Sequence, residues 1–381
     1  MRFKHSSIEK DPSGYLANWT VTNSLSTPCA WNGIICSTDG QVTALNFTDA
    51  GLTGYLHIDD IKSLENLKLL YLGGNYFYGN LSHNITLPRT FETIDLSSNR
   101  FDLPISAQSF LPYCSHLKFL DLSYNSFSGR LSNVKFGVCS NLKVLNLSYN
   151  HLTGYVPLSL RSCTQLQVID LSANNFTCNL PSGFCASFNT SPEKLSLSSN
   201  YLSGPVPAEI ANCKNLQTVD LSFNYLNGSI PSGIWALQNL TDLVIWANHL
   251  SVEIPDNFCE KGSNLETLIL NNNLITGTIP SSFGNCSNLV LVSLSNNRLA
   301  ENVPPAIENL QKLVILQLGN NSLTGEIPPV LGKCRSLIWL ELNNNNFSGS
   351  IPAALSEQSG FIMLSFSFGS LFYSFRNEFR N

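Results

Sequence analysis

The chain has 381 residues, a formal net charge of −5, and 12% charged against 43% hydrophobic residues. Its acidic and basic side chains are scattered, so it has neither a basic stripe for nucleic acid nor a polybasic patch for a membrane surface. No stretch reaches the roughly 20 apolar residues of a membrane-spanning helix, and no basic segment with an apolar core marks a secretory leader. We therefore expect no nucleic-acid partner, and neither a signal peptide nor an anchor in the chain as written.

The amino-terminal segment, "MRFKHSSIEKDPSGYLANW", predicts the second half of an amphipathic helix followed by a turn. Residues 11–14 supply the turn-forming side chains, and Trp19 follows as a core residue. Residues 1–41 are predicted to form an amino-terminal cap on the structure formed by the residues after them. Because the chain starts inside a helix, we expect upstream sequence to be missing.

A phrase of the form "LNLSYNHLTGYVP", found at residues 145–157, recurs along most of the chain with a period of 24 to 26 residues. Its central asparagine is repeated in register at Asn75, Asn99, Asn125, Asn150, Asn174, Asn200, Asn224, Asn248, Asn273, Asn297, Asn321 and Asn345. About thirteen units fill residues 42–358. A period in this range indicates a stack of short structural repeats.

Each part of the phrase has a mechanical role. Leu145 and Leu147 alternate with polar residues, which predicts a short strand with one face inward. Asn150 turns the chain inward, where its amide can satisfy backbone groups of neighbouring turns. Gly154 permits a tight backbone path and Pro157 fixes the dihedral where the chain leaves for the other side. Stacked units would share one continuous core and one parallel sheet.

Two motifs carry a family resemblance. The recurring "LxGxIP", as in "LTGEIP" at residues 323–328, and the segment "NWTVTNSLSTPCAWNGIIC" at residues 18–36 resemble plant extracellular leucine-rich-repeat proteins and their amino-terminal cap. The resemblance covers about nine tenths of the chain. It implies an α/β leucine-rich-repeat solenoid, a curved right-handed superhelix with a parallel β-sheet on its concave face.

The eleven cysteines fall into groups by their place in the repeat. Cys29 and Cys36 flank Trp31 in the cap, where a covalent link adds most, and we expect a disulfide there. Cys178 and Cys185 have the same spacing, but Cys178 takes the usual glycine position, so their pairing stays open. Those expected to act as small buried hydrophobes occupy a position that also accepts leucine: Cys114, Cys139, Cys163, Cys213, Cys286 and Cys334.

Cys259 is expected to stay free, and the histidines are dispersed, so we expect no metal and no cofactor. Asn-x-Ser/Thr sequons are dense enough to suit a secreted glycoprotein. Those expected to carry glycans are Asn18, Asn80, Asn84, Asn175, Asn189, Asn227, Asn239, Asn320 and Asn346.

The outward strand residues change in character along the repeats. In the first half they are Asp-x-Ser pairs such as Asp95 and Ser97, which predicts a polar, mildly acidic wall. From the ninth unit, the same face carries Val244, Trp246, Ile269, Leu291, Ile315 and Trp339. Apolar groups aligned on a solvated wall usually mark contact with another element, so these six residues are predicted to form a contact surface.

A closer resemblance appears in the second half. The run "NLETLILNNNLITGTIPSSFGNCSNLVLVSLSNNRL" at residues 264–299, with "VIWANHL" before it, is similar to the brassinosteroid receptor kinases of plants and their receptor-like paralogues. In that family a folded island interrupts the array, packs on the inner wall of the preceding repeats, and completes a steroid pocket. The resemblance implies a brassinosteroid and a leucine-rich-repeat co-receptor kinase as partners, and the extracellular side of the plasma membrane as location.

Residues 359–381 are aromatic-rich and lack the period, and we expect them to be the truncated start of the island or an aberrant tail. No glycine-rich nucleotide loop, catalytic-loop aspartate or Asp-Phe-Gly is present, so we expect no enzyme activity, although the intact family protein would be a serine/threonine kinase. The predicted function is extracellular ligand recognition. The alternative is a defence protein of the polygalacturonase-inhibitor or receptor-like-protein type, whose usual cysteine-paired end does not follow Cys334.

Overall fold

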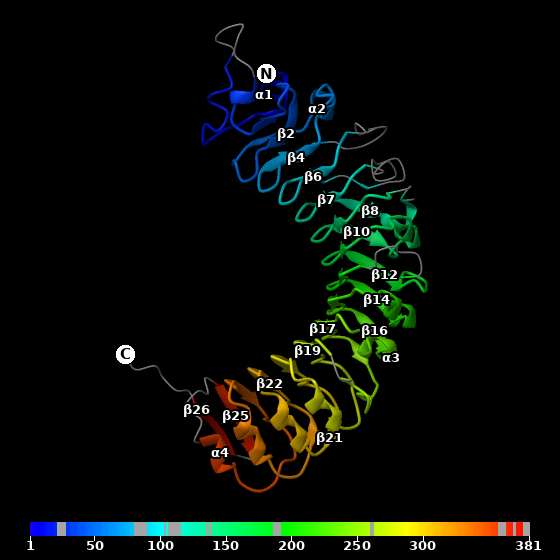
Figure 1. Cartoon of the computed structure of the whole chain (residues 1–381), viewed down its shortest axis with the longest axis vertical. Helices are drawn as coiled ribbons and strands as arrows, with labels where there is room; N and C mark the ends of the chain where they lie inside the picture. The colour runs from blue at the N-terminus through cyan, green and yellow to red at the C-terminus, as the bar shows by residue number, and fades with distance from the viewer. Residues whose placement is uncertain are drawn as a thin grey trace, which may run out of the picture. The chain divides into compact units, whose positions relative to one another are not determined.

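The computed structural model describes residues 1–20, 28–79, 90–102, 104–105, 116–134, 136, 139–185, 192–259, 263–356, 363–368 and 371–375. The chain divides into two compact units, Met1–Pro192 and Glu193–Asn381. Each unit is built from short strands that follow one another at the repeat spacing, with turns and short helices between them (Figure 1).

Unit 1 begins with the cap and continues into repeats. Its helices are α1 (Arg2–Ser7), η1 (Pro28–Ala30), α2 (Ile58–Lys62), η3 (Leu131–Asn133) and η4 (Leu158–Ser162). The main sheet of the unit has the order β1 (Ile34–Cys36), β2 (Val42–Asn46), β4 (Leu69–Tyr71), β6 (Thr93–Asp95), β7 (Phe119–Asp121), β9 (Val144–Asn146) and β11 (Val168–Asp170). The cap strand β1 is antiparallel to β2, and the repeat strands from β2 to β11 are parallel.

A second set of strands follows the ladder asparagines of unit 1: β3 (Thr53–Tyr55), β5 (Tyr76–Tyr78), β8 (Ser128–Arg130), β10 (His151–Gly154) and β12 (Asn175–Asn179). Strand β3 pairs with β5, and β10 lies between β8 and β12, in parallel. Most repeats of this part therefore contribute strands on both sides of the turn. The repeat of Asn99 contributes only an isolated bridge on the second side, between Pro104 and Ser128.

Unit 2 repeats the same plan. Its main sheet runs through β13 (Lys194–Ser196), β15 (Thr218–Asp220), β17 (Asp242–Val244), β19 (Thr267–Ile269), β20 (Leu291–Ser293), β22 (Ile315–Gln317), β24 (Trp339–Glu341), β25 (Met363–Phe368) and β26 (Leu371–Phe375). The secondary strands are β14 (Tyr201–Pro205), β16 (Tyr225–Gly228), β18 (His249–Leu250), β21 (Ala300–Glu301) and β23 (Ser322–Leu323).

Short helices stack on the side of unit 2 that lies away from the main sheet: η5 (Ala208–Asn212), α3 (Ser232–Trp235), η6 (Ser281–Asn285), η7 (Pro305–Asn309), η8 (Pro329–Lys333) and α4 (Ala353–Ser356). The α/β repeat solenoid with a parallel sheet, predicted from the sequence, is confirmed. No helix among the described residues is long and apolar enough to cross a bilayer.

The repeat leucines form the core, and the ladder asparagines join successive repeats. Leu145 and Leu147 are fully buried. Asn150 donates to the carbonyls of Leu147 and Ser148 in its own repeat and of Leu122 in the preceding one, at 3.0–3.1 Å. Its Oδ1 accepts from the Phe127 amide, also in the preceding repeat, at 2.9 Å. One side chain thus satisfies four backbone groups in two repeats.

The turns of most repeats have left-handed backbone at two places. The residue before the ladder asparagine has a positive φ, as at Tyr149 (53°) and Phe223 (50°). The later position is usually glycine, as at Gly154 (87°), and there Cys178 adopts a φ of 68°. The repeat geometry therefore holds Cys178 in a conformation that favours glycine.

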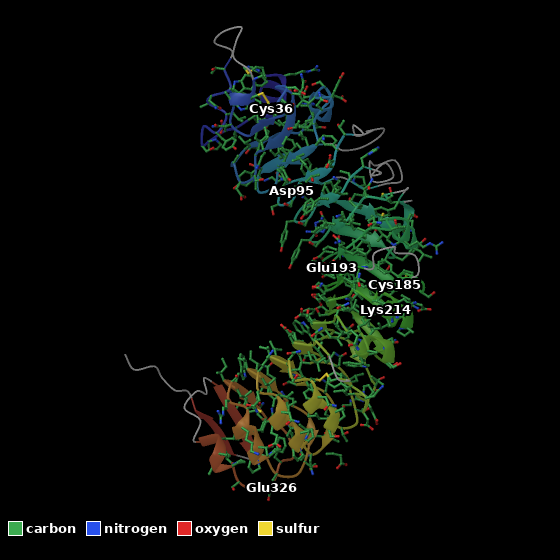
Figure 2. All side chains as sticks on the ribbon, viewed as in Figure 1. Cys36, Asp95, Cys185, Glu193, Lys214 and Glu326 are labelled. Carbon is green, nitrogen blue, oxygen red and sulfur yellow. A yellow bond between two sulfur atoms is a disulfide. The ribbon has the colours of Figure 1, made fainter. Side chains whose placement is uncertain are left out.

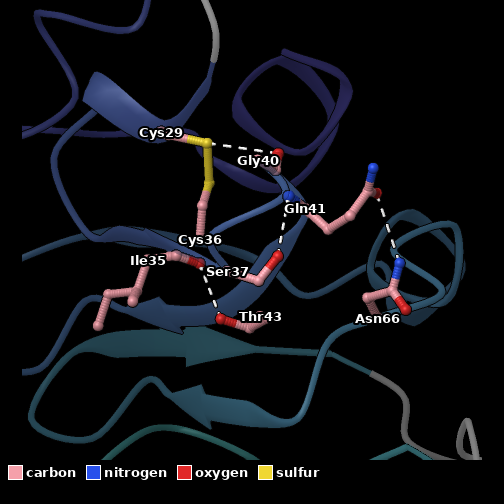
Figure 3. The surroundings of a disulfide bond; sticks show 8 residues. All are labelled: Cys29, Ile35, Cys36, Ser37, Gly40, Gln41, Thr43 and Asn66. Atoms are coloured by element: carbon pink, nitrogen blue, oxygen red, sulfur yellow. Dashed lines mark hydrogen bonds between the residues drawn. A yellow bond between two sulfur atoms is a disulfide. The ribbon is translucent and has the colours of Figure 1, made fainter.

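The cap covers the first repeat through aromatic packing and a disulfide. Trp19 is buried, and its ring lies 5.7 Å from Phe47 and 5.1 Å from Trp31. Cys29 and Cys36 form a disulfide, shown in Figure 3, with Cα atoms 5.6 Å apart. These contacts shield the apolar end that a solenoid would otherwise expose.

The parallel pairing of the repeats continues beyond the predicted repeat boundary. Strand β25 pairs in parallel with β24, with Met363 opposite Trp339. The separation of these two residues equals the repeat length, although Gly369 occupies the position of the ladder asparagine. The repeat register therefore extends past residue 358, and β26 then returns antiparallel to β25.

Candidate recognition surface

The polar strand residues of unit 1 are engaged with one another. Asp95 Oδ1 accepts from the Ser97 amide at 2.9 Å and from its hydroxyl at 2.7 Å. Figure 2 labels Asp95 on the strand-lined side of the unit. The same arrangement recurs at Asp121 with Ser123. One oxygen of each carboxylate therefore satisfies the backbone where the strand turns.

Unit 2 retains this arrangement at Asp220 with Ser222, and then loses it. At the two equivalent positions of the next repeat stand Val244 and Trp246. The six predicted contact residues, Val244, Trp246, Ile269, Leu291, Ile315 and Trp339, are all half-buried, so each keeps part of its surface in solvent. We call these six residues the apolar strand face.

The apolar strand face is not a single column. Val244 lies opposite Ile269, whereas the strand partner of Ile269 on β20 is Ser293. Leu291, Ile315 and Trp339 form a second column, displaced by two residues along the strands. Because two residues is one period of a strand, both columns share the same face. Trp246 lies two residues beyond Val244 and belongs to neither column, so the single column that we predicted is corrected to three offset positions on one face.

Polar groups border the second column. Gln317 Nε2 donates to Glu341 Oε2 at 3.3 Å, and Gly319 lies beside the Glu341 carboxylate, where a Cβ would come within 2.6 Å of an oxygen. Burial raises the pKa of the Glu341 carboxyl above its ordinary value, and the hydrogen bond from Gln317 opposes this shift. Trp339 Nε1 is buried and has no hydrogen-bond partner among the described residues.

Exposed aromatic side chains flank the ladder asparagines, and they were not predicted from the sequence. In unit 1, the Tyr124 and Tyr149 rings stack with centroids 4.1 Å apart. In unit 2, Phe223 packs edge-on against Trp246 at 4.0 Å. The signal was present, because these tyrosines and Phe223 immediately precede ladder asparagines.

The cysteines correct several predictions. Cys178 is free and exposed, so it is not bridged to Cys185, which lies in another disulfide. Cys259, expected to be free, is bonded to Cys286, one repeat further along the chain. Cys139 and Cys213 are also disulfide-bonded rather than simple buried hydrophobes, and Cys114 lies outside the described residues.

Cys163 and Cys334 are free and buried, as expected. Burial raises the pKa of the Cys163 thiol to about 12. Burial, with a smaller contribution from Glu308, raises the pKa of the Cys334 thiol to about 11. Both are therefore protonated and unreactive at neutral pH.

The sequon asparagines differ in accessibility. Asn18, Asn227, Asn239 and Asn346 are exposed, whereas Asn175 and Asn320 are half-buried. Asn80, Asn84 and Asn189 lie outside the described residues. Within the described part of the chain, no group of three or more His, Cys, Asp or Glu side chains is placed to hold a metal ion.

Comparison with known proteins agrees with this geometry. Leucine-rich-repeat family models match residues 115–176 and 238–299, and also residues 191–213, 215–237, 312–334 and 336–357. A leucine-rich-repeat N-terminal domain model matches residues 1–37. The chain belongs to the leucine-rich-repeat family.

The resemblance to plant brassinosteroid receptor kinases is confirmed by curated relatives. The chain is 44% identical over 133 residues to brassinosteroid LRR receptor kinase BRL3 of Oryza sativa subsp. japonica. It is 36% identical over 131 residues to receptor-like protein kinase BRI1-like 3 of Arabidopsis thaliana. Each match spans 34% of this chain and 11% of the relative.

Two solved receptor structures share the fold over more of the chain. The receptor in the PEPR1–AtPEP1 complex has a TM-score of 0.75 at 32% identity, with 94% of this chain and 53% of that chain covered. The plant peptide hormone receptor RGFR1, in complex with RGF2, has a TM-score of 0.71 at 33% identity, with 81% and 48% covered. This chain thus has the fold of a plant receptor ectodomain.

Proposed function

We propose that the chain forms the amino-terminal part of the extracellular region of a plant receptor kinase of the brassinosteroid-receptor type. In this proposal the apolar strand face of unit 2 supports a folded island that completes the hormone pocket. A co-receptor kinase with a shorter repeat array is the expected partner, on the outer side of the plasma membrane. The observation that carries the proposal is the replacement of the Asp and Ser pair, last seen at Asp220 and Ser222, by half-buried apolar side chains at Val244 and Trp246 and by Ile269 on the next strand.

The contrast between the strand positions supports the choice of site. Where the face is polar, carboxylates and serine hydroxyls satisfy one another within a strand, as in Asp220 with Ser222. At Val244 and Trp246 no such local role exists. Burying their exposed area against a partner would yield roughly 25 cal/mol per Å².

The test uses a chimera in which residues 1–358 are joined to the downstream extracellular region of rice BRL3. We expect the chimera to bind brassinolide with submicromolar affinity by calorimetry, and the 381-residue chain alone to show no such binding. Trp246→Asp should weaken binding by about tenfold or more, because it places a charge in the docked face. Tyr124→Asp, at an exposed aromatic of unit 1, is the control and should leave affinity unchanged. Submicromolar binding by the chain alone, or an unaffected Trp246→Asp chimera, would contradict the proposal.

A peptide ligand is the second candidate, because the similar solved receptors named above are peptide-bound and match more of the chain than the brassinosteroid relatives do. In that case the apolar strand face would bind the peptide directly. The 381-residue chain would then bind a peptide without any added region, and Trp246→Asp would abolish that binding.

A further inference from the structure

Strand β16 presents an acceptor asparagine beside an exposed tyrosine. Tyr225 is 52% exposed, Leu226 is fully buried, and Asn227 is exposed. Because strand side chains alternate, Tyr225 and Asn227 lie on the same face, roughly 6–7 Å apart along the strand. Asn227, Gly228 and Ser229 complete an Asn-x-Ser sequon.

The Tyr225 ring belongs to a three-ring stack. Its centroid lies 6.2 Å from that of Tyr201 and 6.0 Å from that of His249, with interplanar angles of 17° and 14°. The three residues stand at the same position of successive repeats. We call them the aromatic shelf. Two of its rings, Tyr201 and Tyr225, are at least half exposed.

Asn227 lies directly beside the aromatic shelf. Across the strand ladder it stands opposite Pro205 of β14 and His249 of β18, and His249 is a member of the shelf. Within the described residues the Asn227 amide makes no hydrogen bond, so modifying Nδ2 breaks no contact. Asn239 differs from Asn227 in two respects. Its Nδ2 donates to the Lys214 carbonyl at 3.0 Å, and the residue two positions before it is the buried Leu237 rather than an exposed aromatic.

We propose that Asn227 carries an N-linked glycan whose first sugar packs against the aromatic shelf. Nδ2 loses one hydrogen and bonds to the anomeric carbon of N-acetylglucosamine, and the lipid diphosphate of the oligosaccharide donor leaves. A pyranose ring has an apolar C–H surface, and aromatic side chains combine large apolar area with a polar tip that can stay in solvent. In this arrangement the sugar covers part of the aromatic shelf.

This inference rests on the proposed function, because N-glycosylation requires that the chain pass through the secretory pathway. The full chain, preceded by a secretory signal peptide, is secreted from plant cells. Glycan occupancy is measured by glycopeptide mass spectrometry, and Tm is measured by calorimetry. We expect Asn227→Gln to lower Tm by about 2–4 °C when Tyr225 is present. In a Tyr225→Ala background the same change should shift Tm by less than about 1 °C, and the double-mutant cycle isolates the coupling.

Asn239→Gln is the matched control and should shift Tm equally in both backgrounds. Tyr225→Phe, which keeps the ring, should keep the coupling. An unoccupied Asn227 beside an occupied Asn239, or equal Tm shifts for Asn227→Gln in both backgrounds, would overturn this inference while leaving the proposed function intact. A secreted chain without sugar at either site would count against both.

Discussion

Replacing a ladder asparagine tests how the repeats are held together. In Asn150→Ala the Phe127 amide loses its acceptor, and the carbonyls of Leu122, Leu147 and Ser148 each lose a donor. Two of these four groups belong to the preceding repeat. The substitution therefore weakens both the turn and the contact between neighbouring units.

The size of the effect follows from burial. Asn150 is only 5% exposed, so water cannot readily replace the lost bonds. Each unpaired buried polar group costs about 1–3 kcal/mol, but the carbonyls have second lone pairs and the turn can relax. We expect a loss of about 3 kcal/mol in the free energy of unfolding.

Urea unfolding followed by circular dichroism measures this loss. Asn66→Ala is the control, because Asn66 is exposed and makes a single hydrogen bond, to Gln41 Oε1 at 3.4 Å. It should cost less than about 0.5 kcal/mol. A loss below about 1 kcal/mol for Asn150→Ala would refute the claim that the ladder couples the repeats.

Three further predictions concern the cap, the thiols and the Glu341 carboxyl beside the apolar strand face. Cys29→Ser should lower the free energy of unfolding by about 2 kcal/mol, measured by urea unfolding under oxidising conditions, because it opens a short disulfide loop in the cap. At pH 8, dithionitrobenzoate should label Cys178 rapidly, and should label Cys163 and Cys334 only after unfolding. Folding raises the pKa of these two buried thiols. The free energy of unfolding should therefore fall as the pH rises above the ordinary thiol pKa. Glu341→Gln should stabilise the chain by about a few tenths of a kcal/mol at pH 7 and not at pH 3. The reason is that burial raises the pKa of the Glu341 carboxyl and disfavours its ionised form. Unfolding curves at a series of pH values measure the effect, with Glu326→Gln, at an exposed site, as the control.

Sequence periodicity predicted the solenoid because its physics is local and repeated. The alternation of Leu145 and Leu147 fixes which strand face is buried, and Asn150 marks the turn that every repeat needs. The same register placed Val244 and Trp246 on the outward face. The offsets were also readable from the sequence, since Ile269 lies four residues and Leu291 six residues before its ladder asparagine, but grouping all outward positions together hid them.

The disulfides could not be predicted from one repeat. Cys286 occupies a position that also accepts leucine, which favoured a buried thiol, yet Cys259 of the preceding repeat lies beside it. Pairing depends on adjacency between repeats rather than on composition within one. Likewise β25 lacks the ladder asparagine, and only its backbone pairing with β24 identifies it as a further strand.

The most direct test of the central claim is hydroxyl-radical footprinting of the apolar strand face. Labelling of Trp246, Ile269 and Trp339 is compared between the 381-residue chain and the brassinolide-bound chimera, with Tyr124 as the internal reference. We expect several-fold protection of these three side chains in the chimera and equal labelling of Tyr124. Unchanged labelling of all four residues would contradict the claim that this face docks a partner.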